Sequence, residues 1–405
     1  MTEKKVEYIE LIYDLIFVYI IGRNNSLIEH VSPAGFVEME TYITYILATL
    51  VVLTIWYHST LLINRYGKND VGQHICLFVN MYLLYFMADS TSVHWQHFYV
   101  RYNLAWALIL LNLSLHYFLC LHKITLEKRS SKTENQELRL ERTAEEEQIR
   151  HSIVSLLLQA LIAAAGIPGY FLTGLPLSLL AIPAGLMLSL SGRGRGHSSN
   201  VPVDFMHLTE RVMLYIVFTF GEMVIAISGY FQSDFQEGIT VNTIYFSLCA
   251  FLIVAGLFLS YGFVYNRILD REKRANETGY MFLHIFMIIA LNNLSTALEF
   301  MREDAVAAVP KNVFLVASFL MYYLALFLMW IYAKSRQKAD AIFLIRLIIG
   351  STVFTVLMAH FYTNGTISVA ISVIYIYAMF ALIHLFWRSR IRGGKQAGAA
   401  SAGNE

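Results

Sequence analysis

Apolar runs of about twenty residues recur along the whole chain, and a run of that length is what an α-helix needs to cross the hydrocarbon of a bilayer. Hydrophobic residues make up 57% of the 405 residues and charged residues only 15%. A soluble chain has about a quarter of its residues charged. A transmembrane barrel would show short alternating segments instead. We therefore predict an all-α fold, a polytopic bundle of membrane helices.

The apolar runs predict about twelve spans. The first span holds Glu10 and Asp14 and no small-residue cleavage site follows it, so we expect a mature helix and not a signal peptide. The fifth and sixth spans are separated only by LTGLP, which also allows a tight hairpin or a re-entrant pair. The predicted spans are 6–24, 41–63, 74–94, 103–122, 151–172, 174–191, 205–230, 241–265, 279–300, 312–333, 341–361 and 366–387.

Lysine and arginine placement predicts the orientation of these spans. With the N-terminus in the cytoplasm, the cytoplasmic segments hold 24 of these residues and the outer segments hold four. Both termini are therefore predicted to be cytoplasmic. The charged segment 123–150 is rich in helix formers and is predicted to be a solvated cytoplasmic helix. The tail 391–405 has the composition of a disordered end.

The chain also shows weak self-similarity at half its length. The second span reads IWYHSTLLINRYGKND and the eighth reads LFLSYGFVYNRILDRE, which aligns Asn64-Arg65 with Asn266-Arg267 at an offset of 202. Six spans is an even number, so the two halves would share one orientation as parallel repeats. We predict two six-helix repeats, with halves at 1–192 and 193–390.

Ionisable and polar side chains lie on stripes inside several spans. In the first span, Glu7, Glu10 and Asp14 fall on one helical face, and in the seventh a stripe runs from His207 to Glu222 in steps of 4, 4 and 7. Such stripes should face protein or a water-filled cavity and not lipid. The candidate pathway residues are Glu10, Asp14, His58, Asn64, Arg65, His207, Glu210, Arg211, Glu222, His284 and Asn292.

Two interpretations of these stripes stay open. In the structural one, Arg211 pairs with Glu10 or Asp14, and the cluster holds the two halves together. In the functional one, which we favour, the cluster is a proton- or cation-coupled pathway at mid-membrane between the halves. Histidine is the side chain whose charge changes near neutral pH, which suits such a role.

Sequence motifs for soluble-type catalysis are absent, since HExxH, GxSxG and CxxC do not occur. The loop SGRGRGHS lacks the GxxxxGK[ST] pattern of a phosphate-binding loop. We expect no enzyme activity, no cofactor, no metal and no nucleic-acid partner, although buried His and Asp permit an enzyme that acts on lipid. The expected partners are the lipid bilayer and a small solute or ion. The uncharged fifth and sixth spans favour a scaffold role or an oligomer face, such as that of a homodimer.

Three segments resemble the bacterial low temperature requirement protein A (LtrA) family: VEYIELIYDLIFVYIIGRNNSL, TIWYHSTLLINRYGKND and HLTERVMLYIVFTFGEMVIAISG. The sequence departs from the family pattern at Ile12-Tyr13 and at Met223, neither of which is ionisable. The resemblance implies a multi-pass inner-membrane protein linked by name to growth in the cold. The residues that fit the pattern are Glu10, Asp14, Phe17, Trp56, Asn64, Arg65, Asp70, His207, Glu210, Arg211, Gly221, Glu222 and His284.

Three functions follow from this sequence. The first is a proton- or cation-coupled secondary transporter, which we favour. The second is an ion channel lined by the first helix of each half, and the third is a non-transporting membrane scaffold or stress-response protein. A solvated cavity open to one side of the cluster would favour the transporter, a continuous path the channel, and a dry, fully paired cluster the scaffold.

Overall fold

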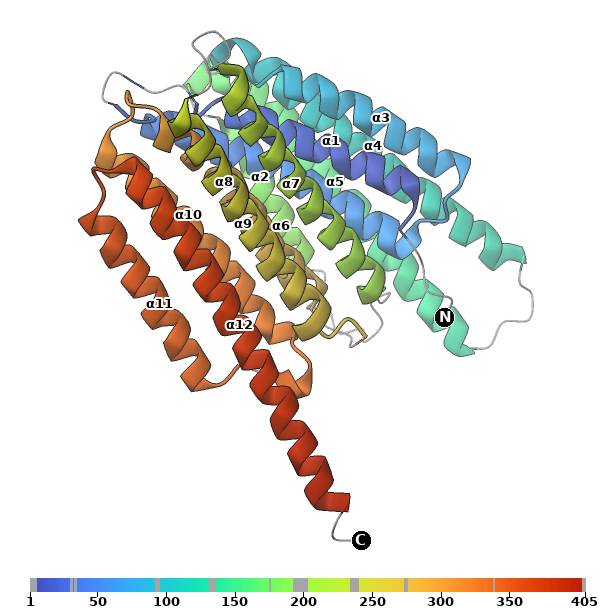
Figure 1. Cartoon of the computed structure of the whole chain (residues 1–405). Helices are drawn as coiled ribbons and strands as arrows, with labels where there is room; N and C mark the ends of the chain where they lie inside the picture. Colours follow the sequence, from blue (N-terminus) through green and yellow to red (C-terminus); the bar gives the residue numbers. More distant parts are fainter. Residues whose placement is uncertain are drawn as a thin grey trace. The chain divides into compact units, whose positions relative to one another are not determined.

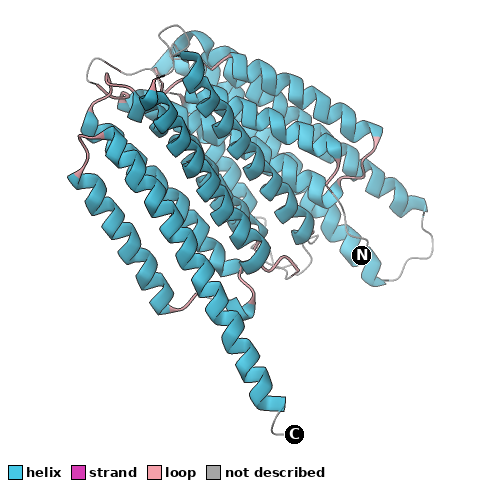
Figure 2. Ribbon diagram, in the orientation of Figure 1, coloured by secondary structure: helices cyan, strands magenta, loops and turns pink. Residues whose placement is uncertain are grey.

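The structure is a computed structural model that describes residues 6–29, 32, 35–91, 95–130, 136–174, 176–191, 203–233, 240–272, 276–337 and 339–402. Within these residues the chain forms twelve α-helices, and the only β-type pairing is an isolated bridge between Leu269 and Ala333. Figures 1 and 2 show the helices and their short connections. The predicted all-α polytopic helical bundle is confirmed.

The chain packs as two compact units. The first consists of the chain up to Ile28 together with Met39–Arg211, and the second of Glu29–Glu38 together with the chain from Val212 onward. The boundary between the units therefore falls inside one helix, Phe205–Ser233 (α7). The predicted boundary after residue 192 rests on the internal repeat, and that repeat stays a prediction.

The first unit is built around two long helices. The fourth and fifth helices pack along each other, the third packs on the first and fourth, the second packs on the same two, and the sixth packs on the fifth. The helices of this unit besides the start of α7 are α1 (Tyr8–Asn25), α2 (Met39–Tyr66), α3 (Val71–Asp89), α4 (Trp95–Ser130), α5 (Gln136–Thr173) and α6 (Ala181–Ser191).

The second unit contains the rest of α7 and five further helices. The eighth helix packs on the twelfth, the ninth on the tenth, and the eleventh on both the tenth and the twelfth. A π-helical turn, Val264–Ile268, continues the eighth helix. The five helices are α8 (Val241–Phe263), α9 (Glu277–Arg302), α10 (Ala308–Leu328), α11 (Ala341–His360) and α12 (Gly365–Ala402).

Side-chain caps explain where several helices begin. Asp70 accepts a hydrogen bond from the Gln73 backbone N–H at 2.9 Å at the start of α3. A side chain also accepts a hydrogen bond from the backbone N–H three residues later at the starts of α8, α9 and α11, where the capping residues are Thr240, Asn276 and Asp340. Each cap satisfies a backbone N–H that has no partner within its own helix.

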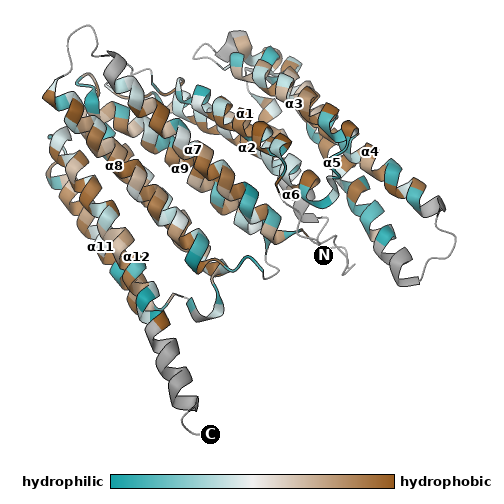
Figure 3. Cartoon of the chain, turned by 45° about the vertical axis from the view of Figure 1, so that its right-hand side comes forward, coloured by the Kyte–Doolittle hydropathy of each residue, from teal (hydrophilic) through white to brown (hydrophobic). Residues whose placement is uncertain are grey.

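Ten helices are long and apolar enough to cross a membrane, as judged over the described residues. The chain is therefore a multi-pass membrane protein. Figure 3 shows hydrophobic residues along the helices and hydrophilic residues gathered toward several helix ends. Two of the twelve predicted spans are missing from the ten. The first, α1, has 18 residues and carries Glu10, Asp14 and Arg23.

The other missing span is the sixth. Its predicted range, 174–191, contains a 3-10 turn, Leu177–Leu180, followed by α6, which has only 11 residues. Eleven helical residues extend about 16 Å, and the hydrocarbon core is about 30 Å thick. Gly166 of α5 lies against Ser178, and a Cβ at that glycine would meet the Ser178 backbone nitrogen at 2.3 Å. The 3-10 turn therefore packs directly on the backbone of α5.

The charged segment and the tail are both helical where they are described. Residues 123–130 continue α4 and residues 136–150 begin α5, while 131–135 lie outside the described residues. The stretch predicted as a disordered tail continues α12 as far as Ala402. Its alanines favour helix, which a composition-based expectation of disorder does not weigh.

Candidate functional site: a buried ionic cluster in the first unit

Helix α1 carries two carboxylates on one face near its start. Glu10 is its third residue and Asp14 its seventh, so the helical period places one above the other. Both side chains are buried, with 1% and 0% of their surface exposed. Two acids at this burial require partners, because burial of an isolated charge is very costly.

Asp14 receives a complete set of donors. The Arg211 guanidinium donates from Nε to Asp14 Oδ2 at 3.0 Å and from Nη2 to Asp14 Oδ1 at 2.8 Å. This is the bidentate geometry in which a guanidinium and a carboxylate interact most strongly. The Trp56 indole N–H from α2 adds a third bond to Asp14 Oδ1 at 3.0 Å. Asp14 is therefore held as a fully hydrogen-bonded carboxylate.

Glu10 shares the same guanidinium at longer range. Its Oε2 lies 3.3 Å from Arg211 Nη1 and 3.5 Å from His207 Nε2. Arg211 and His207 are both fully buried on the first two turns of α7, as its seventh and third residues. One permanent positive charge therefore serves two carboxylates, and the cluster carries one net negative charge unless it binds a proton.

Asn64 fixes the orientation of the His207 ring. Its Oδ1 accepts from the Asp204 backbone N–H at 2.9 Å, and its Nδ2 donates to the Asp204 carbonyl at 3.0 Å. These two bonds determine which end of the amide is which, and they place Nδ2 3.0 Å from His207 Nδ1. An amide nitrogen only donates, so Nδ1 is the acceptor. The hydrogen of the neutral imidazole is then on Nε2, the atom nearest Glu10.

Two members of this arrangement were missed by the sequence analysis as site residues. Trp56 supplies the third donor to Asp14. Asp204 accepts from the His207 backbone N–H at 3.1 Å, so it caps α7 while its own backbone holds Asn64. The signal for Asp204 was an acidic residue just before an apolar run, which is typical of a helix start.

The remaining candidates of the first unit lie outside the cluster. Arg65 follows Asn64 in α2 and lines a separate cavity with Asp70 and Lys123. His58 is half-buried and contacts the Tyr57 ring edge-on. Glu210 is half-buried, one residue before Arg211.

Three candidates belong to the second unit. His284 is fully buried, with Nδ1 2.8 Å from the Tyr280 carbonyl oxygen and Nε2 3.3 Å from Tyr261 Oη. Asn292 donates to the Ile288 carbonyl of its own helix at 2.9 Å. Glu222 is half-buried on α7. Their predicted participation in a site between the halves stays a prediction.

The cluster is built from two carboxylates, one guanidinium and one imidazole, in which Asp14 pairs with Arg211 and Glu10 lies within 3.5 Å of both Arg211 and His207. Among the described residues, no group of three or more His, Cys, Asp or Glu side chains is placed to hold a metal ion.

The model of the family described as bacterial low temperature requirement A protein (LtrA) matches residues 5–379. The matched range contains every residue of the cluster. No curated protein matches the chain.

Proposed function

We propose that this multi-pass membrane protein, which belongs to the LtrA family, is a proton-coupled secondary transporter of a small solute or ion. The family match confirms the resemblance of the three sequence segments. The transport proposal is supported by the cluster in the first unit, and above all by the position of Glu10 between Arg211 and His207.

Charge balance supports the assignment of the proton to Glu10. With Asp14 and Glu10 both ionised and His207 neutral, the buried cluster has one more negative than positive charge. Burial disfavours an unbalanced charge, so uptake of one proton stabilises the cluster. Asp14 is committed to Arg211 and Trp56. His207 Nδ1 is committed to Asn64. Glu10 is therefore the group that gains and loses the proton.

The members of the cluster divide into fixed and exchangeable parts. Arg211 and Asp14 form the fixed anchor that joins α1 to α7, and Trp56 ties the anchor to α2. His207 presents its Nε2 hydrogen toward ionised Glu10, so it stabilises the state that has lost the proton. Binding and release of the proton would then alter only the contacts of Glu10 with α7, while the Asp14–Arg211 pair stays in place. A ligand that interacts differently with two conformations shifts the equilibrium between them.

The position of the cluster allows exchange with one side of the membrane. Glu10 and His207 are each the third residue of their helix, and three residues extend about 4–5 Å along a helix axis. The lysine and arginine distribution predicts that this face is cytoplasmic. We place the exchange site near that face, closer to the surface than the mid-membrane position expected from the sequence.

A second candidate function is a non-transporting scaffold. It is favoured by one observation, namely that Glu10, Asp14, His207 and Arg211 are at most 1% exposed, as in a dry structural lock. We propose that the cluster is not an enzyme active site, because its acidic and basic groups form hydrogen bonds and ion pairs with one another.

Flux measurements in proteoliposomes separate the two candidates. Purified chain is reconstituted with a pH-sensitive dye inside, and a panel of external solutes and cations is added with and without a pH gradient. The transporter should move protons with at least one solute, and Glu10→Gln should remove the pH dependence while the protein stays folded. Glu147→Gln, the same change at an exposed side chain of α5, is the matched control. Absence of any solute-linked proton movement across the panel would favour the scaffold.

A further inference from the structure

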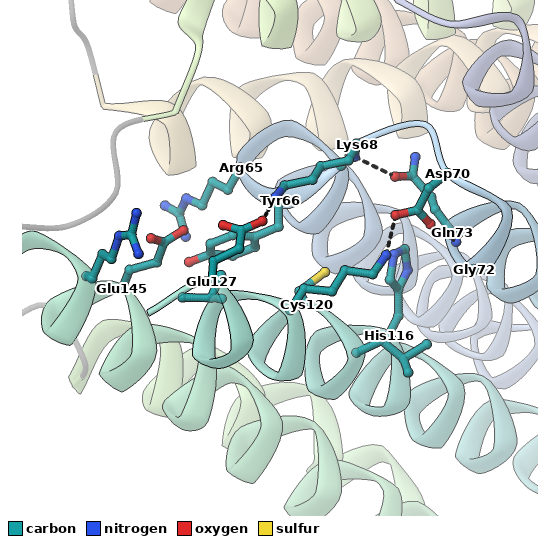
Figure 4. Close-up of a pocket in the computed structure, with 15 residues that line it drawn as sticks. Arg65, Tyr66, Lys68, Asp70, Gly72, Gln73, His116, Cys120, Glu127 and Glu145 are labelled. Carbon is teal, nitrogen blue, oxygen red and sulfur yellow. Dashed lines mark hydrogen bonds and ion pairs between the residues drawn. The ribbon is translucent and has the colours of Figure 1, made fainter. Parts of the chain in front are cut away.

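The first unit contains a charged cavity separate from the ionic cluster. Its volume is about 290 Å³, and it is lined by the last turn of α2, the start of α3 and the facing parts of α4 and α5. Small-ligand sites typically begin at about 300 Å³, so the cavity suits a ligand of headgroup size. Figure 4 shows Arg65, Tyr66 and Glu145 toward one end and Asp70 and Gln73 toward the other.

The lining has one more positive than negative charge when His116 is neutral. Lys68 pairs with Glu127 at 2.9 Å, and Lys123 pairs with Asp70. Both pairs join the connection between α2 and α3 to α4. The four cations are Arg65, Lys68, Lys123 and Arg142, and the three carboxylates are Asp70, Glu127 and Glu145.

Two buried polar groups of the lining have no hydrogen-bond partner among the described residues. They are Tyr66 Oη and His116 Nδ1, on side chains only 7% and 4% exposed. Buried polar atoms are nearly always hydrogen-bonded in folded proteins. A hydroxyl can donate to an anion, and an imidazole can do so from a protonated nitrogen. A ligand with several acceptor oxygens would satisfy both groups.

We propose that this cavity binds a phosphate-bearing anion, with the guanidinium groups of Arg65 and Arg142 as its main contacts and the Tyr66 hydroxyl as an added donor. Guanidinium groups match the geometry of phosphate oxygens by paired hydrogen bonds. The cavity lies where the apolar part of α2 ends and α4 and α5 continue as charged helices. Basic pockets at this level between membrane helices suit lipid phosphates as well as free ones.

The test measures binding to the full-length purified chain from two sources of phosphate. Inorganic phosphate is titrated against detergent-solubilised protein by calorimetry and by thermal unfolding, because a ligand that binds only the folded state raises the unfolding temperature. In the second arm, the chain is placed in phosphatidylcholine nanodiscs with and without phosphatidylglycerol. Stabilisation by inorganic phosphate assigns a free anion, and stabilisation by phosphatidylglycerol alone assigns a lipid headgroup. No stabilisation in either arm overturns the proposal.

Variants that change the charge of the lining show whether the ligand is an anion or a cation. Arg65→Ala and Arg142→Ala should each weaken binding about tenfold, the loss of roughly one charge-assisted hydrogen bond. Glu145→Gln should strengthen binding, since it raises the positive charge of the lining. Arg101→Ala, at the other end of α4, should leave the affinity unchanged. The opposite pattern, with stronger binding in the arginine variants and weaker binding in Glu145→Gln, would show a cation site and overturn the proposal.

Tyr66→Phe keeps the test informative if the arginine variants fail to fold. The Tyr66 hydroxyl makes no hydrogen bond within the described residues, so its removal should leave the unfolding temperature without ligand unchanged or slightly raised. The affinity for the anion found in the first test should fall several-fold. Unchanged affinity in Tyr66→Phe would remove this hydroxyl from the site, and together with unchanged affinity in both arginine variants it would refute the assignment.

Discussion

Asp14 tolerates its place in a membrane helix because it is not a lone carboxylate. Two bonds from Arg211 and one from Trp56 replace the water that it loses on burial. Glu10 lies farther from the same guanidinium, at 3.3 Å, and the proposed function assigns the exchangeable proton to Glu10 on the basis of this difference. Two carboxylates on one helical face therefore differ in how completely they are hydrogen-bonded, because they lie at different distances from their partners.

Removal of Arg211 should be among the most damaging single changes in the chain. Arg211→Ala leaves two buried carboxylates without their cation, and loss of one partner of a buried pair costs about 3–5 kcal/mol. We expect a large fall in unfolding temperature and in the yield of monodisperse protein, measured by thermal unfolding and size-exclusion chromatography. Glu222→Gln should cost much less, since Glu222 is only half-buried. Arg101→Ala serves as the exposed control, and equal stability of all three variants would contradict the anchor role.

The charge of Asp70, which lies between two spans, is expected to contribute less to stability than that of Arg211. The Lys123 ammonium and, after it, the Gln73 backbone N–H lower the pKa of Asp70 below its ordinary value. A lowered folded-state pKa adds stability at neutral pH that is lost as the pH falls through that pKa. Asp70→Asn keeps a capping side chain and removes the charge. Wild type should unfold at a slightly higher temperature than Asp70→Asn at neutral pH, since about a third of the Asp70 side chain is exposed.

The same comparison at acidic pH tests whether this stability difference comes from the charge of Asp70. The difference between wild type and Asp70→Asn should shrink as the pH is lowered below about 3.9, the usual pKa of aspartate. A difference that persists or grows in acid would show that Asp70 acts through its shape and not through its charge.

The helical period and energetics together predicted part of the site. Glu10, Asp14, His207 and Arg211 could be placed on facing stripes, because residues four apart share a helix face and buried acids need a cation. The sequence does not predict whether Arg211 pairs with Glu10 or with Asp14, because that choice depends on the register of α1 against α7. The tautomer of His207 depends on backbone atoms of Asp204, and periodicity carries no information about them.

Among the helices, the sixth span shows where apolar length is misleading. The range 174–191 is apolar enough for a span, but Gly174 has a positive φ just after α5 and Pro176 directly precedes a short 3-10 turn. Only 11 residues of the range then form an α-helix. The helices α8, α9 and α11 follow their apolar runs closely, and each begins after a side-chain cap. By contrast, α4, α5 and α12 continue well beyond their apolar runs.

Close approach of α5 to this 3-10 turn predicts a sensitive glycine. Gly166→Ala would place a Cβ 2.3 Å from the Ser178 backbone nitrogen, so the two segments must move apart. Such overpacking typically costs about 1–3 kcal/mol. Gly221→Ala in α7 meets nothing within 4 Å and should gain up to about 1 kcal/mol from helix propensity. Thermal unfolding should therefore move in opposite directions for the two variants, and a shared direction would contradict the packing of α5 on the 3-10 turn.

At the scale of the whole chain, the class of protein is confirmed, whereas the internal repeat and the membrane orientation are still predictions. Family membership and the ten membrane-capable helices found among the described residues agree that it is a multi-pass membrane protein. The parallel repeat and the cytoplasmic termini remain predictions from sequence. Asn64 and Asn266, which the repeat aligns, have different surroundings. Asn64 braces His207 and Asp204, whereas Asn266 donates to Gly262 of its own helix. If the halves are duplicated, the first has specialised its ionic site.

The proposed proton exchange at Glu10 is tested most directly by infrared difference spectroscopy of the purified chain between mildly alkaline and mildly acidic buffer. A protonated carboxyl has a C=O stretching band that a carboxylate lacks. We predict that a buried carboxyl band appears on acidification of wild type and of Glu147→Gln, and that the component of this band due to Glu10 is missing in Glu10→Gln. An undiminished band in Glu10→Gln, or no band in wild type, would contradict the assignment of an exchangeable proton to this cluster.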